Sequence, residues 1–205
     1  MQHKDNTTEQ TILEVAENLF LDKGFALTST TEIARIVGCN QALVHYYFRS
    51  KERLFEAVFE KHLKLFIHVF LECVEQNISF EEKVRMKIET HFDLLKANPK
   101  MPFLFFNEMI ANPIRLNLLK EKIGALPETF FSQIESELKK EIEKGTIRPM
   151  KATDLMLTIL SLNTMLFLAG PVLEVISGMT ETEYHNFFEN RKRENITIIL
   201  KSLRP

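Results

Sequence analysis

The feature that most constrains this chain is the spacing of its apolar residues, which recur every three or four positions along almost the whole length. No stretch alternates apolar and polar residues with the period of two that a half-buried strand requires. The first helical face ends near Gly24 and consists of Ile12, Val15, Ala16, Leu19 and Phe20. The 205 residues are therefore predicted to form an all-α protein of about nine helices.

Local signals set the expected helix boundaries. A Ser or Thr followed three residues later by Glu predicts a capping box, in which the hydroxyl accepts a backbone N–H and the Glu side chain reaches back. Glycine and proline mark further ends, so the last two helices are expected at residues 152–169 and 181–202. The three predicted capping boxes are Ser29 with Glu32, Ser79 with Glu82, and Thr180 with Glu183.

Residues 30–49 meet the demands of a helix-turn-helix. Two helices cross closely at its fifth position, where Ala34 is small, and the turn needs a left-handed backbone at its ninth, where Gly38 stands. Asn40 can cap the second helix, whose early residues then project toward a major groove. The small core between the helices is predicted to contain Ile33, Val37, Cys39, Val44 and Tyr47, with Phe48 packing nearby.

The segment from Ile12 to Leu54 resembles the DNA-binding domain of the TetR/AcrR repressors. The resemblance rests on ILEVAENLFLDKGF, on TSTTEIA, and on GCNQALVHYYFRSKERL, which spans residues 38–54. The sequence departs from the family at His45, where Tyr is usual, and at Leu43, where Thr is frequent. Beyond Leu54 the similarity is mostly architectural, with GTIRP at residues 145–149 as a local match.

The exposed start of the second helix is predicted to read DNA bases. Gln can pair bidentately with adenine and small apolar groups can meet a thymine methyl, so Gln41, Ala42 and Leu43 are expected at base edges. The expected phosphate contacts come from two further sets. These are His45, Tyr46 and Lys51, and the residues Thr28, Ser29 and Thr30 at a helix N-terminus. No acidic residue occurs between Ile33 and Lys51, although the whole chain has a net charge of −2.

The resemblance implies two domains, a three-helix DNA-binding domain over residues 1–50 and a domain over residues 51–205 for dimerisation and effector binding. It further implies that the last two helices pair with those of a second copy, for which Leu162, Leu166, Ile198 and Ile199 are candidates. An effector would shift the fourth helix and release DNA. We thus expect a repressor released from a palindromic operator.

Most of the 17 Phe and 8 Met residues follow residue 60, where they pack a core or line an apolar pocket. We expect a hydrophobic small-molecule effector, because burying an ion without a partner costs several kcal/mol, whereas burying apolar ligand surface gains about 25 cal/mol per Å². The candidate pocket residues are the aromatic Phe66, Phe70, Phe92, Phe103, Phe130 and Phe167, and the polar His62, His91, Asn107 and Asn163.

Other function classes receive less support from the sequence. No Gly-rich phosphate loop or nucleophile elbow is present, so no catalytic residue and no cofactor is predicted and the chain is not expected to be an enzyme. His68, Glu72 and Cys73 lie close in sequence without a metal-binding motif, so no metal site is predicted. Two cysteines and no secretory signal indicate the cytoplasm, and the apolar run at residues 155–175 is interpreted as a buried helix, with no membrane contact. An adaptor that binds other proteins without binding specific DNA remains the alternative.

Overall fold

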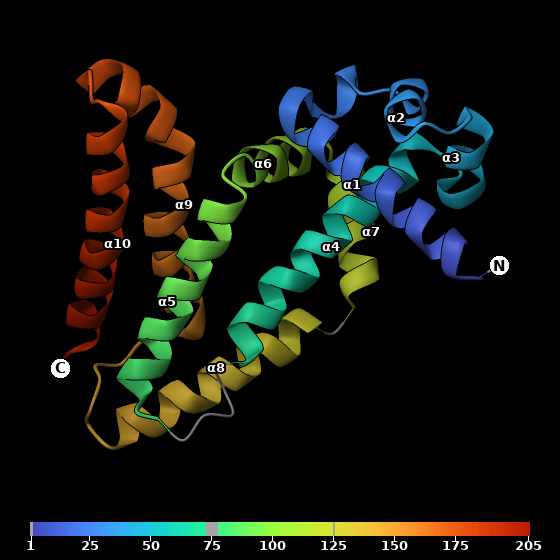
Figure 1. The fold of residues 1–205 in the computed structure, drawn as a ribbon. Helices are drawn as coiled ribbons and strands as arrows, with labels where there is room; N and C mark the ends of the chain where they lie inside the picture. Colours follow the sequence, from blue (N-terminus) through green and yellow to red (C-terminus); the bar gives the residue numbers. More distant parts are fainter. Residues whose placement is uncertain (1, 73–77, 125) are drawn as a thin grey trace. The chain divides into compact units, whose positions relative to one another are not determined.

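The computed structural model describes residues 2–72, 78–124 and 126–205, and in these ranges the protein is helical with no strand (Figure 1). Ten helices are described, where the sequence predicted about nine. Their bounds are α1 Gln2–Leu27, α2 Thr30–Val37, α3 Gln41–Phe48, α4 Lys51–Glu72, α5 Phe80–Ala97, α6 Met101–Ala111, α7 Pro113–Ile123, α8 Leu126–Glu143, α9 Ala152–Ser177 and α10 Glu181–Leu203.

The chain divides into two compact units, which are described separately. Unit 1 holds residues 1–65 and 103–122, and unit 2 holds residues 66–102 and 123–205. This division differs from the predicted boundary at residue 50, because the first part of α4 and most of α6 and α7 group with the N-terminal helices. The apolar spacing that predicts each helix contains no information about which helices share a core.

The core of unit 1 forms where α1, α2 and α3 pack together and α4 adds one apolar face. The predicted face of α1 is buried at Ile12, Ala16 and Phe20, as expected from its helical spacing. Phe55 of α4 meets Phe20 edge to face, with ring centres 5.0 Å apart. The three N-terminal helices thus share one core with the start of α4.

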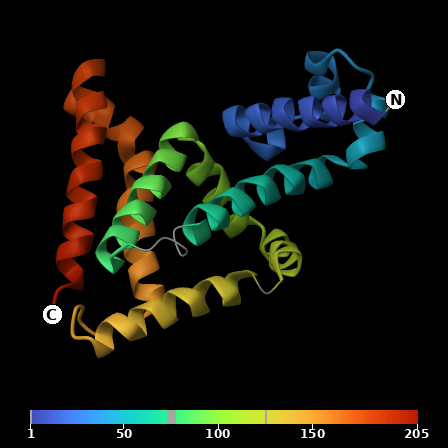
Figure 2. The same ribbon diagram turned by 60° about the horizontal axis from the view of Figure 1, so that its bottom comes forward.

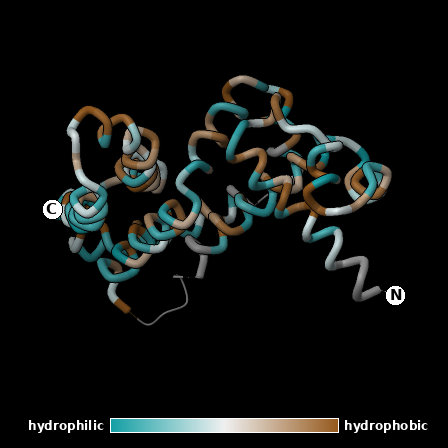
Figure 3. Tube along the Cα trace, turned by 45° about the horizontal axis from the view of Figure 1, so that its top comes forward, coloured by the Kyte–Doolittle hydropathy of each residue, from teal (hydrophilic) through white to brown (hydrophobic). Residues whose placement is uncertain are grey.

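Unit 2 is built on α5, α8, α9 and α10, and α9 and α10 run side by side in both ribbon views (Figure 1, Figure 2). Hydrophobic and hydrophilic residues alternate along the trace of the chain (Figure 3), and apolar residues of all four helices gather in one core cluster. Leu166 and Ile199 are buried in unit 2, at 6% and 0% exposure. The prediction that these two side chains contact a second copy is therefore wrong, while Ile198 is exposed.

The structure shows the outcome at the three helix starts where capping boxes were predicted. Of the three predicted capping boxes, Thr180 with Glu183 forms both hydrogen bonds. Ser29 and Ser79 each accept the N–H of the Glu three residues on, but Glu32 forms an ion pair with Lys23. Hydroxyl caps are thus confirmed at all three sites, whereas Glu32 has found a stronger, charged partner.

Helix α9 extends eight residues beyond its predicted end and contains Pro171. By length and composition alone it could cross a membrane, although a third of its most apolar stretch is buried in unit 2. Core helices of soluble proteins meet the same criterion.

Candidate nucleic-acid interface

Helices α2 and α3 form the predicted helix-turn-helix. Ala34 is buried at the crossing, and Gly38 ends α2 in the left-handed conformation at φ 76°. Asn40 then caps α3, its Oδ1 atom accepting the N–H of Leu43 at 2.8 Å. Ile33 and Val44 fill the small core, which confirms the predicted crossing, turn and cap.

One face of α3 is open to solvent at its start. Gln41, Ala42, His45 and Tyr46 are exposed, whereas Leu43 is half-buried. The Gln41 side chain turns back to α2, where its Nε2 atom donates to the Thr30 hydroxyl at 2.9 Å. To donate this N–H to a base, Gln41 must give up its bond to Thr30, whereas its carbonyl oxygen can accept a bond independently.

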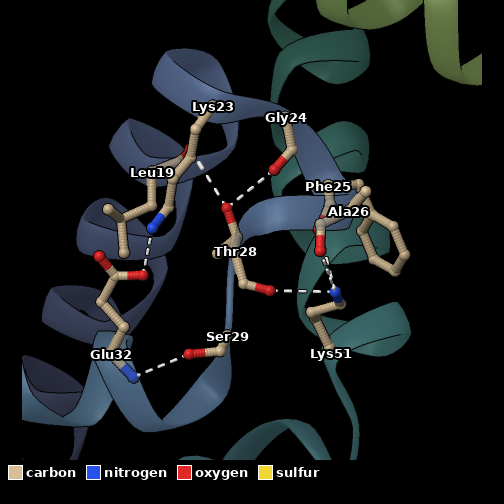
Figure 4. Close-up of polar contacts among 9 residues, drawn as sticks. All are labelled: Leu19, Lys23, Gly24, Phe25, Ala26, Thr28, Ser29, Glu32 and Lys51. Carbon is tan, nitrogen blue, oxygen red and sulfur yellow. Dashed lines mark hydrogen bonds and ion pairs between the residues drawn. The ribbon is translucent and has the colours of Figure 1, made fainter.

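The start of α2 presents two of the three predicted phosphate ligands. Ser29 is exposed and Thr30 is half-buried, so both hydroxyls lie near the free N–H groups of the first turn. Thr28 is only 2% exposed, and its hydroxyl lies 2.8 Å from the carbonyl oxygen of Gly24 (Figure 4). The predicted phosphate contact of the Thr28 side chain is wrong, because this hydroxyl closes the α1–α2 turn.

Lys51 has a structural position that the sequence did not predict. Its Nζ atom donates to the carbonyl oxygens of Phe25 at 2.9 Å and Thr28 at 3.0 Å, with Ala26 at 3.4 Å (Figure 4). An ammonium has three N–H donors, and here each has an acceptor. The prediction of a phosphate contact is corrected, because Lys51 binds the carbonyl end of α1.

Phe25 joins three helices of unit 1 through its ring. The Lys51 ammonium lies 4.2 Å from the ring centre and the Arg115 guanidinium 3.8 Å from it. Arg115 also forms an ion pair with Glu108 and lies over Phe55. Sequence reasoning missed both Phe25 and Arg115, since a contact between residues so far apart in the chain has no local signal.

His62 lies in unit 1 and pairs with Glu17 of α1 at 2.6 Å, so its predicted role in an effector pocket is not supported by its contacts. Burial would raise the pKa of Glu17, but hydrogen bonds and charge from Lys61 and His62 hold it below its ordinary value. The pKa of His62 is lowered by burial, which outweighs the attraction of Glu17. The side chains of Glu17, Lys61 and His62 thus join α1 to α4.

The remaining predicted effector residues do not form one pocket. Phe103 and Asn107 belong to unit 1 and are exposed, while the side chain of Phe70 lies outside the described residues, as does Cys73. His91 and Asn163 are buried in unit 2 and bond each other, with Asn163 Nδ2 3.2 Å from His91 Nδ1. Phe92, Phe130 and Phe167 are core residues, and Phe66 packs against the core and against His91.

Comparisons with known proteins agree with this geometry. The family model "Bacterial regulatory proteins, tetR family" matches residues 12–58, which include the whole helix-turn-helix. The HTH-type transcriptional regulator RutR of Escherichia coli K12 is 27% identical over 202 residues, covering 96% of this chain and 91% of RutR.

Solved structures extend the similarity of fold to both units. The TetR family regulator PfmR of Thermus thermophilus superposes with a TM-score of 0.69 at 20% identity, covering 95% of this chain and 99% of PfmR. AibR, solved with isovaleryl coenzyme A and operator DNA, gives a TM-score of 0.63 at 21% identity, covering 78% of this chain and 86% of AibR. At these identities the structures establish the fold alone.

Proposed function

Because the chain belongs to the TetR family of DNA-binding transcriptional regulators, we propose that it is a dimeric repressor that binds a palindromic operator. Binding of a hydrophobic small molecule makes it dissociate from this operator. It acts in the cytoplasm under this proposal. The observation that carries it is the helix-turn-helix with an exposed α3 start, flanked by hydroxyls and free N–H groups at the start of α2.

In the proposed complex, α3 lies in the major groove. Gln41 and Ala42 face base edges, with Leu43 beside them, and His45 and Tyr46 approach the sugar–phosphate backbone. Ser29 and Thr30 add phosphate contacts from α2. Arg35 and Arg49 are exposed in the segment that lacks acids, so they supply positive charge on the same domain.

The proposed dimer uses an apolar stripe on α9 and α10. Leu157, Met165, Val172 and Ile176 are exposed at intervals of eight, seven and four residues, which places them along one face of α9. Ile198 is the exposed apolar residue of α10. Contiguous apolar surface of this kind marks interaction sites in soluble proteins, and a two-fold pair of helices would cover it.

The test is selection of DNA by the purified protein from a random pool, followed by sequencing. Two-fold dimers read two half-sites one or more helical turns apart, so the selected DNA is expected to be an inverted repeat. Gel-shift affinity for it should fall steeply as salt rises. An absence of DNA binding at low salt would contradict the proposal and favour a protein-binding adaptor.

A further inference from the structure

Unit 2 contains an open pocket that the sequence did not point to. It lies where the end of α5, the middle of α9 and the start of α10 meet, and its volume is about 700 Å³. Small-molecule sites commonly have volumes of about 300–1,000 Å³, so this pocket is large enough for a drug-sized ligand. Ten residues were predicted to bind an effector, and of the nine whose side chains are described only Phe167 lines this pocket.

Three aromatic rings form one wall of this pocket. Phe167 and Phe188 meet edge to face with ring centres 5.2 Å apart, and Tyr184 lies 4.8 Å from Phe188. Phe92 supports Phe167 from the buried side at 5.2 Å. Aromatic groups prefer such edge-to-face and offset contacts, so a flat ring entering the pocket would continue the existing series.

Tyr184 supplies a polar group to this wall. A Cβ atom at Gly170 would lie 2.6 Å from the Tyr184 hydroxyl oxygen, so the hydroxyl occupies space that only glycine leaves open. Within the described part of the chain no residue hydrogen-bonds this hydroxyl. Burial, aided by Glu174, raises the pKa of Tyr184, so the hydroxyl stays protonated near neutral pH.

Pro171 adds an acceptor to the same region. Proline has no N–H, so the carbonyl of Phe167 four residues earlier lacks its usual helical donor. Phe167 and Pro171 both line the pocket, and Gly170, whose Cβ position lies against the Tyr184 hydroxyl, stands between them in α9. One ligand group that donates or accepts a hydrogen bond could therefore be satisfied there.

The charges at the rim offset one another. Lys96 and Lys100 line the pocket together with Glu181, and Lys96 is paired with Glu189 at 2.5 Å. Two cations and two carboxylates give no net attraction for a charged ligand. An anion that approached Lys96 would also have to displace Glu189 from its ion pair.

We propose that this α5–α9–α10 pocket binds an uncharged planar aromatic molecule that carries one hydrogen-bonding group. The ring packs on Phe167, Tyr184 and Phe188, and its polar group bonds the Tyr184 hydroxyl. The claim that this molecule is the effector depends on the proposed function. The claim that the pocket binds such a molecule does not.

The experiment uses two fluorescent probes with the full chain. N-phenyl-1-naphthylamine is uncharged, aromatic and has one N–H, and 1-anilinonaphthalene-8-sulfonate adds a negative charge to the same rings. We expect the neutral probe to bind at about micromolar Kd and the sulfonate at least about tenfold more weakly. Tyr184→Phe should weaken the neutral probe about fivefold, the loss of one hydrogen bond.

A matched pair of substitutions locates the probe. Thr182 lines the pocket and Ser136 is exposed on α8, so Thr182→Trp should block the neutral probe while Ser136→Trp leaves its affinity unchanged. The chain has no other Trp, so fluorescence also reports each indole. Emission should be blue-shifted in Thr182→Trp relative to Ser136→Trp, because its indole enters the apolar pocket.

The outcomes separate the two proposals. Equal binding of both probes, or equal effects of the two Trp substitutions, would overturn the pocket assignment even if the protein binds its operator. Probe binding that Thr182→Trp abolishes, in a protein that binds no DNA, would support the pocket and refute the proposed function. Release of operator DNA by the neutral probe from the wild type, but not from Thr182→Trp, would support both.

Discussion

The ammonium of Lys51 lies 2.9 Å from the carbonyl oxygen of Phe25 and 4.2 Å from the centre of the Phe25 ring. The first residue of α4 thus binds the backbone and the side chain of one residue at the end of α1. Arg115 of α7 lies over the same ring. Within unit 1 this arrangement fixes where α1 ends and α4 begins, on both sides of the helix-turn-helix.

Lys51→Met should therefore lower the free energy of unfolding by more than it lowers the free energy of binding to DNA. Removing hydrogen bonds to three carbonyls and one cation–π contact should lower the free energy of unfolding by about 2 kcal/mol, measured by urea titration. Lys64→Met, at an exposed position of α4, is the control and should change it little. A stable Lys51→Met protein whose DNA binding has become less salt-dependent would restore the phosphate role.

Gln41→Ala tests the orientation of α3. If Gln41 pairs with one base, its loss should cost about 1–3 kcal/mol at one operator position and relax the preference there. Gln133→Ala, at an exposed site on α8, should leave the base preference unchanged. Gel-shift titration against single-base operator variants measures both. A uniform loss across all variants would mean that Gln41 does not read a base.

Local structure was largely predictable from the sequence. A helix cap depends on a hydroxyl or amide and an N–H within three residues, so Ser29 and Asn40 could be assigned without knowledge of the fold. Gly38 was predictable because a left-handed residue favours glycine. The helical spacing of apolar residues likewise identified Ile33 and Val44 as core residues, and both are buried.

Contacts between distant residues were not predictable. Thr28 and Lys51 were assigned to phosphate because hydroxyls and ammonium groups bind anions, but neighbouring carbonyls of α1 satisfy both groups first. For the effector residues, composition showed many Phe side chains but not which of them share a unit. Phe103 and Phe167 prove to belong to different units.

The proposed dimer contact can be tested by charge insertion. Leu157 on α9 and Leu116 on α7 are both exposed leucines, so replacing either by Glu should cost little in the isolated chain. If the α9 stripe is the interface, Leu157→Glu should give a monomer at micromolar concentration by light scattering, and Leu116→Glu should remain a dimer. The proposal fails if the wild type is itself monomeric.

His91 should make stability depend on pH. Burial lowers its pKa from 6.5 to about 4, and Asn163 donates to its Nδ1 atom, which therefore needs to stay unprotonated. Between these values the unfolded chain binds a proton that the folded chain does not, so the contribution of His91 to the free energy of unfolding falls as pH drops below 6.5 and stops falling below about pH 4. At pH 5 the loss from this residue is about 2 kcal/mol relative to pH 7.5.

Substitution of His91 should reduce this slope. His91→Gln removes the titrating group, so its urea-unfolding free energy should change less between pH 7.5 and pH 5 than that of the wild type. Gln133→Ala, at an exposed site on α8, removes no titrating group and should retain the wild-type slope. Identical slopes for all three proteins would show that His91 is protonated in the folded state.

Gly170 and Tyr184 should show strong coupling in a double-mutant cycle. Alanine is the better helix former by up to about 1 kcal/mol, so Gly170→Ala would stabilise α9 if nothing lay against it. The new Cβ would lie 2.6 Å from the Tyr184 hydroxyl and 3.2 Å from Phe188, and only the hydroxyl contact is removed by Tyr184→Phe. Gly170→Ala should therefore destabilise the wild type by about 1–3 kcal/mol and the Tyr184→Phe protein by at least about 1 kcal/mol less. Urea unfolding of the four proteins measures the coupling. Additive effects would mean that Tyr184 moves away from α9 without cost and that its hydroxyl is not held at the pocket wall.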